Sequence, residues 1–332
     1  MSWDGPQPEG IEVQVLAMRG WTRTARRAAF VAQVQQLRNA FDVVLGFNRM
    51  PGLDYYFAAD SCFARKALHE RPWWYRLAPR TRQYLAWEHA VFGAESSSVA
   101  LLLSPQQLRE YGAAYGTPAA RLLMLPPGIR RDFLPPENAT EQRAALRREL
   151  GLGDDDLLVL QVGSGMRVKG VARALQALAA LAPALAARVH YLQIGRGDLG
   201  YWHKRAARLG LQRVRFLGAR DDVPRYMLGA DLLLHPSLQE SAGMVILEAI
   251  VSGLPVLATA SCGYAFHVEQ AGAGLVCPEP FRQETLDHLL QHMLQADRSA
   301  WREAGLHYGR AQALYDMPAA VAALVCSAGE SA

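Results

Sequence analysis

The chain has 332 residues, of which 51% are hydrophobic and 20% are charged. This composition excludes an intrinsically disordered chain, and the length is enough for two domains of ordinary size. The net charge of +4 is too small to predict a nucleic-acid partner. The start is polar and turn-like, so no signal peptide is expected. The cysteines are far apart and lack metal-ligand spacing, which indicates reduced thiols in a cytosolic protein: Cys62, Cys262, Cys277 and Cys326.

The first part of the chain predicts alternating strands and helices, the pattern of an α/β domain. A basic amphipathic helix is expected over residues 21–38. Pro126-Pro127-Gly128 is a stiff break, and we place the domain boundary there. The expected strands of this domain are 11–17, 42–47, 55–59, 99–103 and 122–125.

Residues 64–92 are unusually rich in basic and aromatic side chains. Bases combined with interfacial aromatic residues suit an anionic membrane surface. The alternative is a solvated helix pair whose aromatic side chains lie in the core. Neither a stacking sheet nor a helix-turn-helix pattern accompanies the bases, so nucleic acid is not the expected partner. The residues are Arg65, Lys66, Arg71, Trp73, Trp74, Tyr75, Arg76, Arg80 and Arg82.

The second part predicts a doubly wound domain. A short helix is expected over 146–151, and helices are expected again over 283–326. The glycine-containing turns at 163–165 and 195–197 do not fit G-x-G-x-x-G, so no nicotinamide cofactor is expected. Asp154-Asp155-Asp156 contains D-x-D but directly precedes a strand, which predicts a solvated turn and no metal site. The expected strands are 157–162, 189–194, 214–217, 230–235 and 255–258.

The stretch 235–258 carries the main functional signal. It predicts a strand end, a loop, a helix and a second strand, which puts the loop at the carboxyl edge of a parallel sheet, where α/β proteins bind ligands. Ala242 and Gly243 leave the backbone open at the helix N-terminus, which favours a phosphate. Glu240 and Glu248 frame this loop, and a hydroxyl-rich ligand would satisfy both carboxylates. The alternative is a surface glutamate together with a core-edge glutamate that is salt-bridged to an arginine.

The run E-S-A-G-M-V-I-L-E, from Glu240 to Glu248, resembles the E-x7-E motif of retaining GT-B glycosyltransferases of family 4. Further segments resemble the lipopolysaccharide core glucosyltransferases of Gram-negative bacteria, and they cover nearly the whole chain in order. These segments are G-F-N-R-M-P-G-L-D-Y-Y-F-A-A-D, L-P-P-G-I, L-Q-V-G-S, K-G-V-A-R, A-D-L-L-L-H-P and G-L-P-V-L-A-T-A-S-C-G-Y-A.

The resemblance implies the α/β GT-B fold, with two Rossmann-like doubly wound domains facing a cleft. The domains would be 1–128, which docks on the membrane and holds the acceptor, and 129–310, which binds the nucleotide sugar. Residues 311–332 would form a helix that returns to the first domain. The family's first strand and Gly-Gly loop have no counterpart in this sequence, so the first domain is expected to be truncated. A fragment, a start codon assigned too late and a true loss are the three explanations.

The resemblance also implies a retaining hexosyltransferase that moves glucose from UDP-glucose to the inner-core heptose of lipopolysaccharide. No metal and no other cofactor are expected. The implied partners are UDP-glucose, the heptose acceptor and the anionic surface of the inner membrane, on whose cytoplasmic face the enzyme would be peripheral. Two further hypotheses are a non-catalytic GT-B-like binding protein and the same enzyme class with another donor or acceptor.

Carried over to the matching positions, the family's donor site falls on the second domain. Lys169 would bind the diphosphate, Glu240 the hexose hydroxyls and Glu248 the ribose hydroxyls. Lys169 and Glu240 are therefore candidate catalytic residues. Backbone N–H groups would hold the sugar and phosphate, and they belong to Ala242, Gly243, Met244 and Val245.

Other implied site residues lie on separate loops. The family usually has an arginine beside the lysine, and Arg167 would supply that charge from one position further back. Gly218-Ala219-Arg220 occupies the uracil-binding loop. Asp60, the third catalytic candidate, and Asn48 follow strand ends and are candidates for sugar contacts, with turn or helix capping as the alternative. His235 is interpreted as structural, and no enzymic nucleophile is expected.

Overall fold

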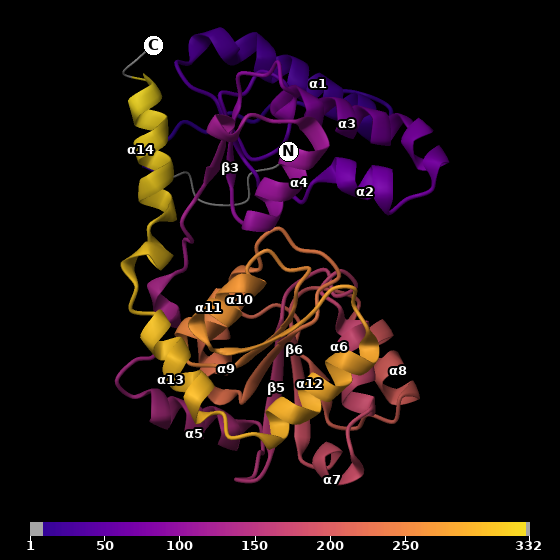
Figure 1. Ribbon diagram of the computed structural model, residues 1–332, viewed down its shortest axis with the longest axis vertical. Helices are drawn as coiled ribbons and strands as arrows, with labels where there is room; N and C mark the ends of the chain where they lie inside the picture. The colour runs from indigo at the N-terminus through magenta and orange to yellow at the C-terminus, as the bar shows by residue number, and fades with distance from the viewer. Residues whose placement is uncertain (1–8, 330–332) are drawn as a thin grey trace. The chain divides into compact units, whose positions relative to one another are not determined.

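The computed structural model describes residues 9–329, which divide into two compact units (Figure 1). Unit 1 holds the described residues up to Leu125 together with those from Ala319 on. Unit 2 runs Pro126–Pro318. The sequence places the first boundary after residue 128 and the start of the returning segment at 311. No helix in the described part of the chain is long and apolar enough to cross a membrane.

Unit 1 contains a four-stranded parallel sheet in the order β1-β2-β3-β4. Its core surrounds the fully buried rings of Tyr56, Phe92 and Tyr111, and the last two stack with centroids 3.6 Å apart. The strands are β1 Leu45–Gly46, β2 Tyr55–Phe57, β3 Val99–Leu102 and β4 Leu122–Met124. The helices are α1 Arg23–Leu37, α2 Phe63–His69, α3 Pro79–Phe92, α4 Pro105–Tyr115 and the larger part of α14 Met317–Gly329, with 3₁₀ turns η1 Arg38–Ala40, η2 Trp73–Leu77 and η3 Ala119–Arg121.

The prediction of a strand over 11–17 is wrong, because this segment has no regular structure and pairs with no described strand. Ile11 and Val15 are 58% and 57% exposed. Apolar residues that alternate with polar ones form a strand only where a neighbouring strand satisfies the backbone groups. The carbonyl of Ala17 instead accepts a hydrogen bond from the Gln33 side chain of α1 at 2.8 Å.

A fully buried carboxylate organises unit 1. Glu88 of α3 accepts hydrogen bonds from the backbone N–H groups of Phe63 and Ala64, at 2.8 and 2.7 Å, and thereby caps α2. It also accepts from the Tyr115 hydroxyl at 2.7 Å and pairs with the buried Arg49. A buried charge is tolerated only with this degree of pairing, so the network fixes α2, α3, α4 and the loop after β1 together.

Unit 2 contains a six-stranded parallel sheet in the order β10-β9-β8-β5-β6-β7. This is the order of a doubly wound dinucleotide-binding domain, and its switch point lies between β5 and β8. The pairing there sets Val159 opposite Leu232 and Leu160 opposite Leu233. The strands are β5 Leu157–Val162, β6 Val189–Ile194, β7 Val214–Phe216, β8 Leu232–His235, β9 Val256–Thr259 and β10 Gly274–Cys277.

Helices cover both faces of this sheet, as Figure 1 shows. The strands are therefore buried on both sides, which explains their continuous apolar runs. A core of leucines, valines and alanines joins α6, α8 and α12 to one face. The elements are η4 Arg131–Phe133, α5 Ala139–Glu149, α6 Val171–Ala179, α7 Pro183–Ala186, α8 Leu199–Arg208, α9 Val223–Gly229, α10 Met244–Val251, α11 Ala265–Ala271, α12 Gln283–Gln295, α13 Ser299–Tyr308 and η5 Gln312–Tyr315.

Two elements of unit 2 differ from the sequence prediction. The helix expected over 146–151 is the end of α5, which already begins at Ala139. The edge strand β10 was not predicted. It begins at Gly274, where a Cβ would lie 1.9 Å from the carbonyl oxygen of Val256. Only glycine fits so close to the neighbouring strand, and a glycine ordinarily weakens a strand pattern.

Candidate active site

Two loops meet at the switch point of unit 2. One follows β5 and carries Lys169, and the other follows β8 and carries Glu240. Both leave the carboxyl ends of adjacent parallel strands, so their residues converge at the edge where doubly wound sheets bind ligands.

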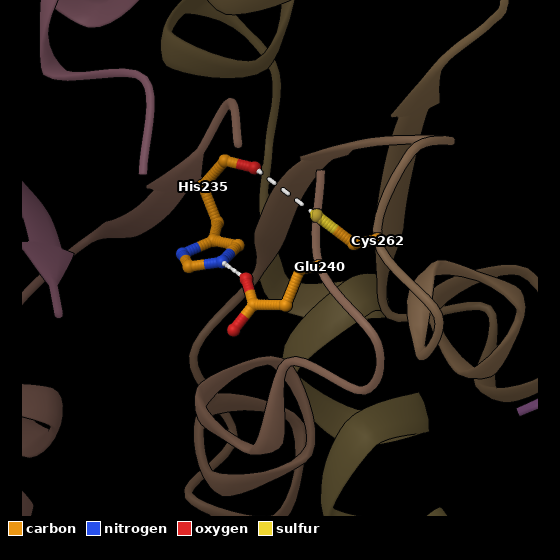
Figure 2. Close-up of side chains that lie close together, drawn as sticks. All are labelled: His235, Glu240 and Cys262. Carbon is orange, nitrogen blue, oxygen red and sulfur yellow. Dashed lines mark hydrogen bonds and ion pairs between the residues drawn. The ribbon is translucent and has the colours of Figure 1, made fainter. Parts of the chain in front are cut away.

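The Glu240 carboxylate is held between two nitrogen groups. Oε1 pairs with the Lys169 ammonium, and Oε2 contacts Nε2 of the buried His235 at 2.6 Å (Figure 2). Burial alone would raise the pKa of Glu240, but His235 and Lys169 together hold it at about 2. Burial alone would lower the pKa of His235, but its hydrogen bonds with Cys262 and Glu240 raise it to about 9. Glu240 is therefore a fixed anion at neutral pH.

Backbone hydrogen bonds fix the loop that carries Glu240. The Glu240 N–H donates to the carbonyl of Ser261 at 3.1 Å, and the Gly263 N–H donates to the carbonyl of Glu240 at 2.9 Å. The Tyr264 N–H donates to the carbonyl of Ala242 at 2.7 Å. The loop after β9 thus holds the loop after β8 in its conformation through these hydrogen bonds.

The two switch-point loops are also bonded to each other. The Leu238 N–H and the Ser237 hydroxyl both donate to the carbonyl of Val168, at 2.8 and 3.0 Å. Gly170 has a φ of +73°, and a Cβ there would lie 1.8 Å from the Pro236 carbonyl oxygen. Arg173 of α6 donates to the carbonyl of Ser237 at 3.0 Å. These contacts place the Lys169 side chain against Glu240.

The N-terminus of α10 adjoins Glu240. Gly243, with a φ of +94°, is the N-cap, and Ala242 and Gly243 are buried within the loop. The first N–H groups of a helix have no acceptor within the helix, and the dipole is positive at this end. Met244 and Val245 therefore present amides suited to an anion next to the paired carboxylate.

Glu248 lies in the second turn of α10 and has a different environment. Its carboxylate forms no ion pair or hydrogen bond with any other side chain in residues 9–329. Burial raises its pKa to about 7 and outweighs the opposite effect of Arg130. The alternative of a structural salt bridge to an arginine is wrong, since Arg130 pairs with Asp132 at 3.1 Å. An unpaired carboxylate in an apolar helix is energetically unfavourable, and a ligand that donates a hydrogen bond would remove this cost.

Other predicted residues do not join this group. The exposed Arg167 lies over the Tyr201 ring, 5.4 Å from its centroid. Arg220 forms a bidentate pair with Asp222, with both contacts at 2.9 Å. Asp60 belongs to unit 1, where it pairs with Arg49 at 3.3 Å, and Asn48 lies in the same unit.

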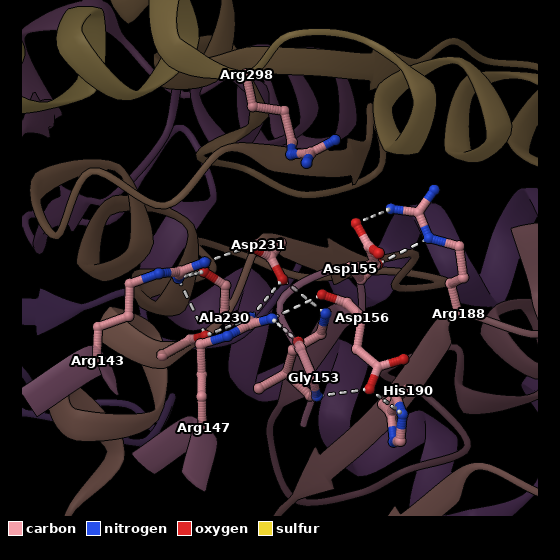
Figure 3. A network of polar contacts seen from close by, with 12 residues as sticks. Arg143, Arg147, Gly153, Asp155, Asp156, Arg188, His190, Ala230, Asp231 and Arg298 are labelled. Atoms are coloured by element: carbon pink, nitrogen blue, oxygen red, sulfur yellow. Dashed lines mark hydrogen bonds and ion pairs between the residues drawn. The ribbon is translucent and has the colours of Figure 1, made fainter. Parts of the chain in front are cut away.

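Two groups of side chains have the residue types of metal ligands. His235, Glu240 and Cys262 place ligand atoms within 4.8 Å of one another, and they offer donor types that zinc accepts. Both Glu240 oxygens, however, already have partners. Asp155 pairs with Arg188 and Asp156 pairs with His190, as Figure 3 shows, and Asp156 also pairs with Arg213. These pairs lie at the amino end of β5, away from the carboxyl ends that carry the site.

Sequence reasoning missed several residues that position Glu240. His235 contacts Glu240 directly, although its place before a proline suggests a purely structural role. Cys262 adjoins His235, and its thiol lies 4.0 Å from the His235 carbonyl oxygen. Their common signal is position, because His235 ends β8, which borders the switch point, and Cys262 follows the neighbouring strand β9.

Comparison with known proteins gives a family match that lies within unit 2. Residues 142–307 match the family model described as "Glycosyl transferases group 1". A crystal structure of HepE from Anabaena in complex with UDP and glucose has a TM-score of 0.72 at 20% identity and covers 95% of this chain and 86% of that one. At this identity the likeness concerns the fold alone. The fold is that of a GT-B glycosyltransferase, as predicted.

Lipopolysaccharide glucosyltransferase WaaG of Escherichia coli (strain K12) is 40% identical over 329 residues, which cover 98% of this chain and 88% of that protein. The crystal structure of WaaG, a glycosyltransferase involved in lipopolysaccharide biosynthesis, has a TM-score of 0.90 and covers 97% of this chain and 89% of its own. The chain belongs to the group 1 glycosyl transferases and, within them, to the family of WaaG. The predicted family is confirmed.

The unpaired Glu248 predicts how stability depends on pH. Folded Glu248 holds a proton up to about pH 7, whereas the unfolded carboxyl releases it near pH 4.5. Glu248 therefore lowers the stability of the folded state as pH rises through this window, and the penalty persists above it. Glu248→Gln should raise the free energy of unfolding at pH 8 by about 2 kcal/mol and leave it unchanged at pH 4. Urea unfolding at both pH values measures this, with the exposed Glu303→Gln as control, and equal changes at the two pH values would contradict it.

Proposed function

We propose that this chain transfers glucose from UDP-glucose to the inner-core heptose of lipopolysaccharide, with retention of configuration and without a metal ion. The observation that carries the proposal is the Lys169–Glu240 pair beside the α10 N-terminus, at the switch point of a doubly wound unit. The name of the WaaG relative supports the lipopolysaccharide acceptor and the glucosyl group.

In this proposal the donor separates the pair. The diphosphate takes the Lys169 ammonium and the free N–H groups of Met244 and Val245. The hexose hydroxyls then donate to Glu240, which stays ionised because His235 still holds Oε2. An ion pair poised to exchange one partner for a ligand keeps both groups oriented before the donor arrives.

The chemical step follows from which groups are free to react. Glu240 is held by its two partners and has a pKa of about 2, so it is a poor nucleophile and serves to orient the sugar. The acceptor hydroxyl attacks the anomeric carbon on the face from which the phosphate leaves. Its proton passes to an oxygen of the departing diphosphate, whose charge Lys169 and the helix N-terminus stabilise.

Glu248 completes the donor site in the proposal. Ribose hydroxyls donate to its carboxylate and replace the hydrogen bonds it lacks in the free protein. The energetic cost of an unpaired, half-buried carboxylate is thereby removed when the nucleotide binds.

The direct test is transfer of labelled glucose from UDP-glucose to lipopolysaccharide that lacks the core glucose. Glu240→Gln should lower kcat/KM for the donor about tenfold to a hundredfold, because a hydroxyl–carboxylate hydrogen bond is lost. Glu303→Gln, an exposed carboxylate of the same unit, should transfer at the wild-type rate. Absence of transfer by the wild-type chain would reject the proposed function.

Metal independence makes a separate prediction. Lysine and helix amides supply the positive charge that a metal would otherwise bring to the diphosphate. Transfer should therefore proceed at an unchanged rate after exhaustive treatment with EDTA. Loss of transfer in EDTA and its recovery on adding magnesium would contradict this prediction.

We further propose that the segment 64–92 docks on an anionic membrane surface, which places the enzyme on the cytoplasmic face of the inner membrane. Trp73, Trp74 and Leu77 are 69%, 59% and 60% exposed, so the alternative of aromatic residues in the core does not hold for this turn. Exposed aromatic residues beside basic ones are typical of an interfacial contact.

The free bases of this segment lie near the exposed tryptophans. Arg76, Arg80 and Arg82 are exposed and form no ion pair with a described residue. Arg65 is different, because it pairs with Glu110 and lies 3.9 Å from Glu70. Three unpaired bases at the surface attract anionic lipid by about 1 kcal/mol each.

Vesicle co-sedimentation tests this docking surface. Replacing Arg76, Arg80 and Arg82 by serine should weaken binding to anionic vesicles more than tenfold at low salt, since the attraction is electrostatic. Replacing Lys204, Arg208 and Arg310, exposed bases of unit 2, by serine is the matched control and should have a smaller effect. Equal binding to neutral and anionic vesicles, or no effect of the first triple change, would place the docking surface elsewhere.

A further inference from the structure

Three side chains of different chemical types meet around the Glu240 carboxylate, as Figure 2 shows. His235 ends β8, Glu240 lies on the loop after β8, and Cys262 lies on the loop after β9. Each offers one ligand atom, and these atoms all lie within 4.8 Å of one another. No other group of three histidine, cysteine or acidic side chains in residues 9–329 brings its ligand atoms so close. The proposed donor chemistry gives the Cys262 thiol no role.

The group supplies one nitrogen, one oxygen and one sulfur ligand. Zinc accepts all three types, and three protein ligands with a water molecule in the fourth position form a common zinc site. Magnesium and calcium prefer oxygen ligands, so an imidazole and a thiol select against them. The donor set is therefore suited to zinc and to similar thiophilic cations.

The backbone already holds two of the three ligands side by side. Glu240 and Cys262 form an isolated parallel β-bridge, so the two loops that carry them are fixed to each other. In a tetrahedral zinc site the ligand atoms lie roughly 3.3–3.6 Å apart. Nε2 of His235 lies 2.6 Å from Oε2 of Glu240, so these atoms must separate by roughly 0.7 Å. Small side-chain rotations on a fixed backbone are sufficient for this change.

Lys169 controls access to the group. Its ammonium pairs with Oε1 of Glu240, and an ammonium at this position repels an entering cation. The Lys169 and Glu240 side chains are 23% and 14% exposed, whereas His235 is fully buried. Solvent therefore reaches the group at the carboxylate. A metal ion can enter there when Lys169 leaves Oε1.

We propose that His235, Glu240 and Cys262 form an inhibitory zinc site. Zinc binds Nε2 of His235, a carboxylate oxygen of Glu240 and the Cys262 sulfur, with a water molecule as the fourth ligand. The protons of Nε2 and of the thiol pass to water, and the ion pair between Glu240 and Lys169 is broken. The ion takes no part in transfer, so the site is compatible with catalysis without a metal.

The consequence for the enzyme follows from the role of Glu240. A carboxylate that coordinates zinc cannot accept hydrogen bonds from the hexose of the donor, so zinc should compete with UDP-glucose. Only this consequence rests on the proposed function, because zinc binding is measurable without any donor.

Cobalt(II) as a probe for zinc tests the site directly. A thiolate ligand gives an intense charge-transfer band, and tetrahedral cobalt gives strong visible bands. Wild type should show both, and so should the matched control Cys326→Ser, which removes an exposed thiol. Cys262→Ser should lose the charge-transfer band. It should also bind zinc at least about a hundredfold more weakly in calorimetry, since loss of a second-shell partner alone costs up to that much.

The variant Lys169→Met should have the opposite effect on zinc. It removes the competing positive charge and frees Oε1, so zinc binding should become about tenfold tighter while UDP binding weakens. Lys204→Met, an exposed lysine of α8, is the matched control and should change neither affinity. General damage to the site would weaken both affinities, so the sign of the zinc effect separates the two explanations.

Inhibition is measured with the rate of each variant normalised to its own rate without zinc. Zinc should raise the KM for UDP-glucose in wild type and in Cys326→Ser, and Cys262→Ser should need at least about tenfold more zinc for the same effect. Retained UDP binding shows that Cys262→Ser is folded, and Lys169→Met provides a test that is independent of the thiol.

The contradicting outcomes are distinct. A wild type without the charge-transfer band, a Cys262→Ser variant that keeps it, or weaker zinc binding by Lys169→Met would overturn the site. Zinc binding that leaves the KM for UDP-glucose unchanged would overturn the inhibitory role. Zinc binding with the predicted spectrum in a chain that transfers no glucose would reject the proposed function and leave the zinc site standing.

Discussion

The largely buried carboxylate of Glu240 imposes the constraint on which the donor-binding unit depends. An anion removed from water needs charged partners, and here they come from two strands, as Lys169 after β5 and His235 at the end of β8. Bringing both to one carboxylate requires tight loops, which glycine at position 170 and the Ser237–Val168 bonds allow. The switch point of the sheet thus becomes a preformed polar site.

The two glutamates of the motif solve different problems. Glu240 is ionised and held in place before any ligand arrives, whereas Glu248 has no partner and a pKa of about 7. The pairing of Glu240 orients its carboxylate before the ligand binds. The unpaired carboxylate of Glu248 lowers the stability of the free protein but leaves its oxygens available to a ligand. A comparable arrangement occurs in unit 1, where the buried Arg49 pairs with Glu88 and its Nε has no hydrogen-bond partner in the described chain.

Local sequence patterns predicted the elements whose structure does not depend on distant neighbours. The strands β5 and β6 were predicted with their observed bounds, because strands buried on both faces are continuous apolar runs. The segment 11–17 has a strand-like pattern but no neighbour to pair with, and β10 depends on glycine lying against Val256. Glu240 and Glu248 were found from the strand, loop and helix pattern, and Lys169 was found by resemblance. The roles of His235, Cys262 and Glu88 depend on contacts between loops that periodicity does not encode.

The central claim is that the unpaired Glu248 binds the ribose hydroxyls of the nucleotide. Proton release on UDP binding tests this claim most directly. UDP is titrated into the protein at pH 7 in two buffers with different enthalpies of ionisation. Hydroxyl donors stabilise the ionised carboxylate, so the account predicts release of about half a proton from Glu248 when UDP binds. The Glu248→Gln variant should release none. Proton uptake, or the same release from wild type and variant, would contradict the account.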